Sequence, residues 1–201
     1  MKISSLNRIL IFATVFLAAY QIAIGIDQMD SIPIIAYTIA FGVILVAGLL
    51  LVILGFEVLD APIVVIISTI IPLALSFGLV WQHFASLRTS YLVFAIVGFL
   101  AVIVTRSIPM QNKLPVFVIA FTHGISGMTI FLLPIIIAVQ GQVKPLFALV
   151  GVGGALIGVG GLLLSFLKTG KPILSRETIL KLFPILLLLT TLFFVAGFKL
   201  G

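Results

Sequence analysis

The sequence contains no cysteine, and this absence removes several kinds of chemistry at once. Disulfide bonds, thiolate nucleophiles, cysteine-ligated zinc, iron–sulfur clusters and thioether-linked haem are all excluded. Charged residues are also scarce: they make up 8% of the 201 residues, against about 25% in a typical soluble domain. With 63% hydrophobic residues, the chain cannot cover its surface with polar groups. It is predicted to be a membrane protein.

Acidic residues are few, and none falls in the middle of a long apolar run. Ion-coupled pumps and proton relays place ionisable side chains inside the membrane, so this pattern argues against them. A Ser–His–acid set, paired buried carboxylates and a phosphate-binding loop cannot be assembled either, and we expect the chain not to be an enzyme. The acidic residues are Asp27, Asp30, Glu57, Asp60 and Glu177.

What the sequence has in abundance is long apolar runs, separated by charged, proline-containing or glycine-containing breaks. A helix needs about 20 apolar residues to cross a bilayer, and alternating strands of the barrel type are absent. The predicted fold is therefore all-α, a polytopic bundle of seven transmembrane helices in a single domain, residues 1–201. The expected spans are 9–26, 32–56, 61–81, 89–105, 114–139, 146–167 and 179–198.

The distribution of basic residues predicts the orientation. With a cytoplasmic N-terminus, eight basic residues lie on the cytoplasmic side and three outside, as the positive-inside rule requires. We expect an integral protein of a prokaryotic cytoplasmic membrane, with its C-terminus outside. Lipid headgroups, not nucleic acid, account for the net charge of +6. The cytoplasmic set is Lys2, Arg8, Arg106, Lys113, Lys168, Lys171, Arg176 and Lys181; the outer set is Arg88, Lys144 and Lys199.

An internal repeat is suggested when the chain is aligned with itself at an offset of 112 residues. Units 1–84 and 113–201, joined by the helix 89–105, would then be parallel repeats about an axis along the membrane normal. Chance similarity in a sequence rich in glycine and proline is the alternative. This plan resembles the layout of the SWEET sugar transporters, although the Pro-Gln dipeptide of the related PQ-loop proteins is absent and the expected orientation is opposite. The matched pairs include Pro33 with Pro145, Gly42 with Gly154, Gly48 with Gly160 and Pro72 with Pro184.

His123 is the most informative polar residue within a span. It lies roughly 13 Å deep at 1.5 Å per residue, and Thr122, Ser126 and Thr129 recur beside it at helical spacing. This polar flank is expected to face the bundle interior. Either a neutral histidine ties two helices together, or the flank binds a polar ligand atom such as a quinone carbonyl or a transported solute.

Two further features mark the spans. Pro72 and Pro184 remove backbone hydrogen bonds and can expose carbonyls, so with His123 they are the candidates for a solute pathway. Glycines at steps of three, four and three residues form a groove without side chains on the sixth span. The groove suits close helix packing or a lipid, pigment or isoprenoid tail. These glycines are Gly151, Gly154, Gly158 and Gly161.

Residues 121–132, Phe-Thr-His-Gly-Ile-Ser-Gly-Met-Thr-Ile-Phe-Leu, resemble a His-Gly segment in the seven-helix subunit III of haem–copper oxidases. The second histidine of that family, its Glu-containing and Trp-rich segments and its buried lipid-binding acid have no counterpart in this chain. A haem held by His83 and His123 would need both at similar depth, and we expect them half a membrane apart. No metal site or cofactor is predicted.

Three functions remain open. The first is a non-catalytic hydrophobic subunit or scaffold of a larger membrane complex, such as a respiratory one. The second is a small transporter or channel for an uncharged or weakly polar solute, and the third is a protein that binds quinone, haem or lipid. The expected partners are the lipid bilayer together with other membrane subunits or a second copy of the chain.

Overall fold

The computed structural model describes residues 3–26, 29–168 and 174–201. The predicted all-α bundle is confirmed, because this part of the chain contains seven helices long and apolar enough to cross a membrane, and no strand. Lys2, Asp27 and Lys171, which entered the sequence argument, lie outside the described residues. The helices are α1 Ser5–Ile24, α2 Ser31–Leu54, α3 Pro62–His83, α4 Arg88–Ser107, α5 Leu114–Val139, α6 Ala148–Lys168 and α7 Arg176–Leu200, and the short 3-10 turns are η1 Phe56–Asp60, η2 Ala85–Leu87 and η3 Pro145–Phe147.

Local capping explains why several helices begin outside the apolar runs. The Ser4 side chain accepts a hydrogen bond from the Asn7 N–H, and Ser175 does the same for Thr178, so α1 and α7 each start with a polar turn. Gly25 and Gly55 end α1 and α2 with positive φ angles of 67° and 83°, a conformation that side chains other than glycine rarely adopt.

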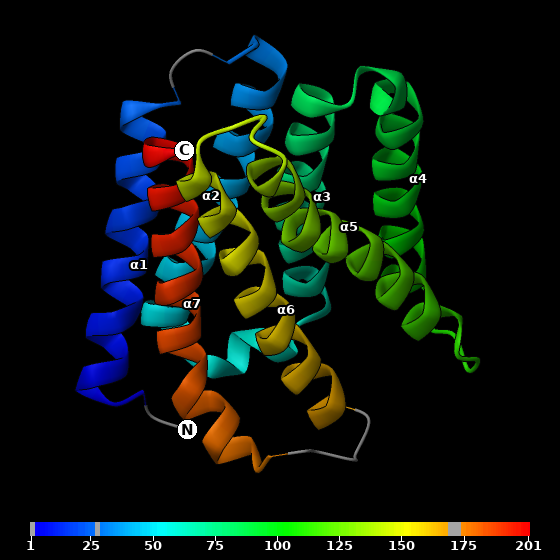
Figure 1. Ribbon diagram of the computed structural model, residues 1–201. Helices are drawn as coiled ribbons and strands as arrows, with labels where there is room; N and C mark the ends of the chain where they lie inside the picture. The colour runs from blue at the N-terminus through cyan, green and yellow to red at the C-terminus, as the bar shows by residue number, and fades with distance from the viewer. Residues whose placement is uncertain (1–2, 27–28, 169–173) are drawn as a thin grey trace.

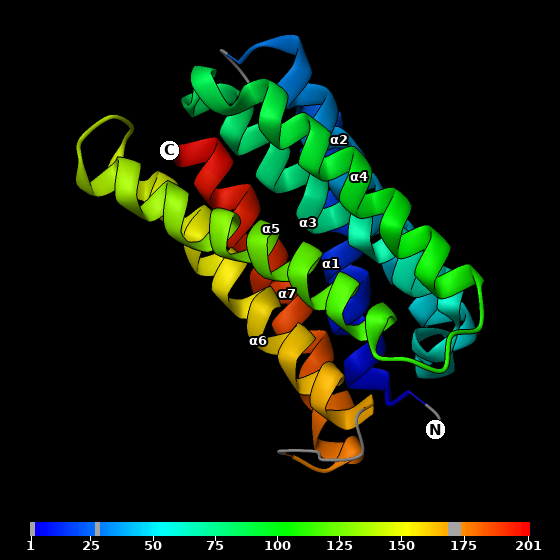
Figure 2. The ribbon, with the colours of Figure 1, turned by 90° about the vertical axis from the view of Figure 1, so that its right-hand side faces the viewer.

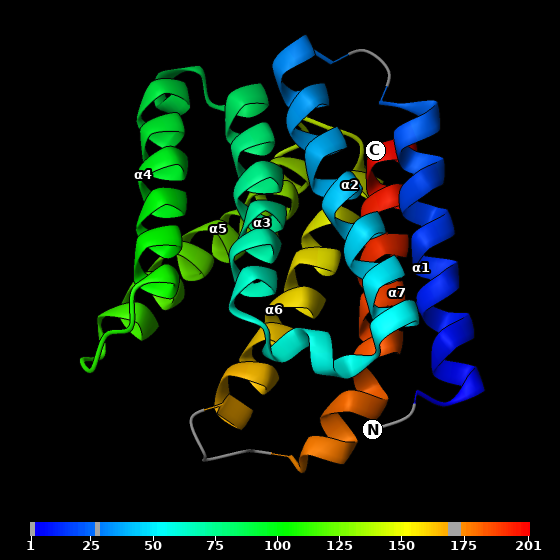
Figure 3. The ribbon, with the colours of Figure 1, turned by 180° about the vertical axis from the view of Figure 1, so that it is seen from behind.

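The helices form two layers. Figure 3 shows α1, α2, α3 and α4 side by side in chain order, with α5, α6 and α7 behind them. Figure 2 views the layers from the side and shows how α5 runs beside α3 and α4. Contacts of α1 with α7 at one end, and of α3 and α4 with α5 at the other, join the two layers.

These contacts close a ring of six helices in the order α1, α2, α3, α5, α6 and α7. Helix α4 lies outside this ring and packs against α3 and α5. The start of α1 and the end of α7 lie at opposite ends of the bundle (Figure 1), which we call the N-terminal side and the C-terminal side. Which side faces the cytoplasm stays a prediction.

Aromatic side chains fill the space between the layers on the C-terminal side. The Tyr37 ring of α2 lies 4.5 Å from the Phe198 ring of α7, and the Phe147 ring of η3 lies 6.0 Å from Phe198. Phe41 packs edge-on against the same ring. The Tyr37 ring comes so close to α3 because Gly78 has no side chain there. We call Tyr37, Phe41, Phe147, Phe194 and Phe198 the aromatic cluster.

The internal repeat stays a prediction. A two-fold axis along the bundle would exchange α1 with α5, α2 with α6, and α3 with α7. Each neighbouring pair in the ring would then need a counterpart: α1 with α2 matches α5 with α6, α2 with α3 matches α6 with α7, and α3 with α5 matches α7 with α1. All six pairs are in contact, so the neighbour pattern is compatible with the repeat.

Candidate functional site

The polar flank of α5 packs against α4. Thr122 and Ser126 are buried, and the Thr122 side chain lies where Gly98 of α4 leaves room for it. Thr129 donates to the Ile125 carbonyl at 2.8 Å and accepts from the Tyr91 hydroxyl of α4 at 3.2 Å. Two of the predicted site residues therefore serve helix packing.

His123 is half-buried beside this flank. Its Nδ1 lies 3.1 Å from the Ile119 carbonyl oxygen, which can only accept, so Nδ1 is the donor in this contact. Arg106 lies in the last turn of α4, the helix that packs against α5. The Arg106 Nε is buried and has no hydrogen-bond partner among the described residues. Sequence reasoning placed Arg106 only among the orientation signals.

Pro72 and Pro184, the two candidate prolines, do not lie close together. Pro72 lies in α3 and Pro184 in α7, which occupy separate positions in the ring; only α3 is a neighbour of α5 and hence of the helix that carries His123. The Ser76 hydroxyl donates to the Pro72 carbonyl at 2.6 Å, so this carbonyl has an additional partner within its own helix.

The four glycines of α6 divide into two pairs. A Cβ at Gly151 would lie 2.5 Å from the Phe131 carbonyl oxygen, and one at Gly154 would lie 2.7 Å from the Ile130 side chain, so both glycines lie directly against α5. A Cβ at Gly158 or Gly161 would meet nothing within 4 Å. The C-terminal-side half of the predicted groove is filled by α5, and the other half is open.

A groove with wholly apolar walls lies between α2, α3 and α4, and sequence reasoning missed it. This groove has a volume of about 470 Å³, within the range typical of small-molecule sites. Buried Leu73 and Ala36 lie at its base, while exposed Ile35 and Ile96 stand on its two walls, so the groove opens to the surroundings of the bundle. We call it the α2–α4 groove.

A polar cluster stands at the C-terminal-side end of this groove. The Arg88 Nε donates to the Trp81 carbonyl at 2.7 Å, and its guanidinium lies 5.2 Å from the Trp81 ring centre. Asp30 Oδ2 lies 3.8 Å from Arg88 Nη2. Trp81 in turn packs on Phe77, which lines the groove, at a ring distance of 5.4 Å. The cluster therefore takes one residue from the end of each helix that forms the groove.

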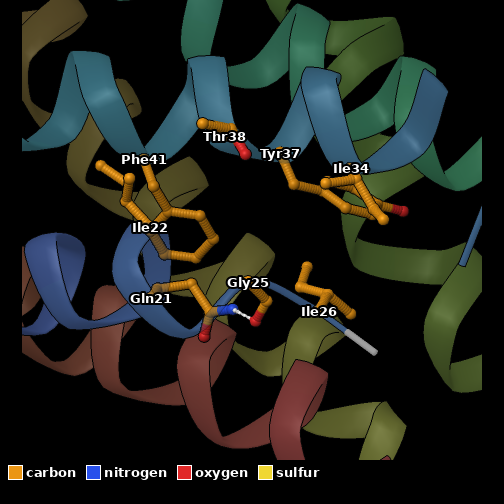
Figure 4. Close-up of a pocket in the computed structure, with 8 residues that line it drawn as sticks. All are labelled: Gln21, Ile22, Gly25, Ile26, Ile34, Tyr37, Thr38 and Phe41. Atoms are coloured by element: carbon orange, nitrogen blue, oxygen red, sulfur yellow. Dashed lines mark hydrogen bonds between the residues drawn. The ribbon is translucent and has the colours of Figure 1, made fainter. Parts of the chain in front are cut away.

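A second, much smaller cavity lies between α1 and α2 (Figure 4). Its volume of about 10 Å³ is close to the space that a single water molecule needs. The Gln21 side-chain N–H donates to the Gly25 carbonyl at 2.9 Å, as the dashed line in Figure 4 marks. The Gln21 Oε1 and the Tyr37 hydroxyl are buried without a hydrogen-bond partner among the described residues.

The histidines and acidic residues do not form a recognisable metal centre in the described part of the chain, where no three such side chains lie together. His83 ends α3 on the C-terminal side, and its ring lies 5.6 Å from the Phe147 ring. His123 lies nine residues after Leu114, where α5 starts on the opposite side, so the two histidines have different surroundings.

Comparisons with known proteins add no assignment: no family model matches the chain, and neither a curated protein nor a solved structure is significantly similar to it. The fold itself defines the class. Seven apolar helices joined by short connections make this chain an integral membrane protein of the all-α type.

Proposed function

We propose that the chain is a non-catalytic subunit or scaffold of a larger membrane assembly, and that α4 contacts its partner. The observation that supports this proposal best is the poor packing of α4 against its own bundle. Only 6% of the α4 span is buried, whereas the other six spans are between 22% and 44% buried. The two buried residues of α4 are Val102 and Thr105.

The outward face of α4 is continuous and apolar. Val93, Val97, Leu100 and Val104 recur at steps of four, three and four residues, which places them on one side of the helix, and about half of each side chain is exposed. Membrane helices associate mainly through van der Waals packing, because lipid tails are as apolar as the side chains. A helix that uses little of its surface inside the bundle has that surface available for another chain.

The transport hypothesis has less support. A pathway between the two three-helix units would pass between the layers, where the aromatic cluster packs on the C-terminal side. Neither the α2–α4 groove nor the small cavity beside Gln21 lies between those units.

Site-specific photo-crosslinking in native membranes tests the proposal. A benzophenone amino acid at Val97 is expected to form a cross-link to another protein, and mild detergent extraction followed by native mass spectrometry should show that protein in a fixed ratio. The matched control is Phe16, an exposed apolar residue of α1 that is 71% exposed and should give lipid adducts only. Lipid adducts at both positions, together with a bare monomer or a homo-oligomer in the mass spectrum, would contradict the subunit proposal and favour transport.

A further inference from the structure

The α2–α4 groove lies along the C-terminal-side part of α2, α3 and α4. Its α4 wall runs from Leu92 to Leu100, about 12 Å at 1.5 Å per residue. On α2 it runs from Ile32, next to the start of the helix on the C-terminal side, to Ile39. One leaflet contributes about 15 Å to the hydrocarbon core, so the groove has the depth of a single leaflet.

The residues that line the groove are all aliphatic or phenylalanine. An occupant cannot form side-chain hydrogen bonds there and gains only from dispersion contacts and shape. The groove therefore suits an acyl chain and provides nothing to hold the polar atoms of a quinone ring or a solute.

The C-terminal-side end of the groove is polar, in contrast to its apolar walls. Arg88 lies one helical turn beyond Leu92, at the depth where phospholipid phosphates lie, and Trp81 beside it is the residue type enriched at that interface. The Arg88 Nε donates its hydrogen bond to the Trp81 carbonyl. The two Nη groups of Arg88 make no hydrogen bond among the described residues, because Asp30, at 3.8 Å, is beyond hydrogen-bond distance. The guanidinium is thus held in place, and its Nη groups remain available to donate hydrogen bonds to a ligand.

We propose that the α2–α4 groove binds one glycerophospholipid, with an acyl chain in the groove and its phosphate on Arg88. Asp30 balances the charge of Arg88, and its side chain is 70% exposed, so the cluster favours a zwitterionic headgroup, whose ammonium can approach Asp30, over an anionic one. By the expected orientation this lipid belongs to the external leaflet.

The short length of the groove favours a lipid over a partner helix as its occupant. A transmembrane helix packs along the whole core, about 30 Å, whereas this groove ends after about 12 Å. The outward face of α4 proposed above as a docking surface continues along the helix to Val104 and shares only Leu100 with the groove wall. The two proposals therefore concern adjacent faces of α4, and each is tested at residues that the other face does not include: Val97 for the partner, Ala95 and Ile96 for the lipid.

Native mass spectrometry of the full chain in mild detergent, with added phosphatidylethanolamine, tests the inference. Ala95→Phe fills the groove, and Val93→Phe places the same side chain on the outward face as a matched control. We expect wild type and Val93→Phe to retain one lipid, Ala95→Phe to lose about tenfold in affinity, and Arg88→Ala to lose about tenfold through the missing charge-assisted hydrogen bond. Phosphatidylglycerol should bind more weakly than phosphatidylethanolamine, and inorganic phosphate should not displace the lipid.

Three results would overturn the inference. The first is equal lipid retention by Ala95→Phe and Val93→Phe, which would indicate unspecific lipid around the bundle. The second is tight binding of a simple fatty acid that does not change in Arg88→Ala, which would remove the phosphate contact. The third is a protein cross-link, in place of a lipid adduct, from a benzophenone amino acid at Ile96 in the groove.

Discussion

Adding one methyl group to α6 should have opposite effects at two of its glycines. At Gly151 a Cβ would lie 2.5 Å from the Phe131 carbonyl oxygen and 2.7 Å from Ile135 Cγ1, whereas at Gly158 a Cβ would meet nothing within 4 Å. The backbone oxygen of α5 cannot rotate away as a side chain can. Gly151→Ala must therefore push α6 and α5 apart, and Gly158→Ala need not move anything.

The size of the effect follows from the required displacement. A carbon atom in contact with a carbonyl oxygen needs about 3.3 Å, so the helices must separate by roughly 0.8 Å at Gly151. A gap of that order removes about a quarter to a half of the dispersion energy of the nearby atom pairs, and overpacking costs about 1–3 kcal/mol in total. Replacing glycine by alanine within a helix gains up to about 1 kcal/mol, which is the only effect expected at Gly158.

Thermal unfolding in mild detergent measures the difference, with the fluorescence of the single tryptophan, Trp81, and circular dichroism as probes. At about 2–4 °C per kcal/mol for a chain of this size, we expect Gly151→Ala to lower Tm by roughly 2–12 °C. Gly158→Ala should leave Tm unchanged or raise it by roughly 1–4 °C. A Gly151→Ala protein that melts with or above the Gly158→Ala protein would refute the close contact between α6 and α5.

Three further experiments test other contacts. Gly78→Ala should lower Tm because its Cβ would lie 2.5 Å from the Tyr37 ring, and the loss should largely vanish in a Tyr37→Leu background; equal losses in both backgrounds would contradict the contact. Tyr91→Phe should cost about 0.6 kcal/mol, measured by denaturant titration, by removing the bond to Thr129, and an unchanged stability would mean that water replaces that bond. A cysteine at Lys144, introduced into this cysteine-free chain, should react with an impermeant maleimide on intact cells, and labelling only after permeabilisation would reverse the expected orientation.

The fold could be predicted from the sequence because one physical requirement dominates it. A segment in hydrocarbon must satisfy its backbone hydrogen bonds within itself, so long apolar runs become helices. The run 114–139 was predicted with the bounds that α5 has, because Lys113 precedes it and Gln140 follows it. The starts of α1 and α7 were missed by three or four residues, because polar capping residues extend a helix beyond its apolar part.

The candidate site was harder to predict because it depends on which helices become neighbours. The periodicity of α5 placed Thr122 and Ser126 on one polar face, and both are buried. It could not show that α4 would supply Gly98 against this face. The α2–α4 groove is made of ordinary alanine, isoleucine, leucine and phenylalanine, which look the same in a sequence whether they line a hollow or face lipid. Only the spacing of the three helices distinguishes these cases.

The position of α4 outside the ring accounts for both the α2–α4 groove and the exposed apolar face of α4. If units 1–84 and 113–201 are parallel repeats of three helices each, the chain must cross the membrane once more between them, because three crossings reverse its direction. The ring is closed by the six repeat helices, so the additional helix has to lie outside it and can pack on only a part of its surface. That position leaves a gap over α3, bounded by α2 and α4, and a free face on the far side of α4. Ile96 and Val97 are adjacent in sequence but point about 100° apart, so cross-linking at the two positions reports on the groove and the free face separately.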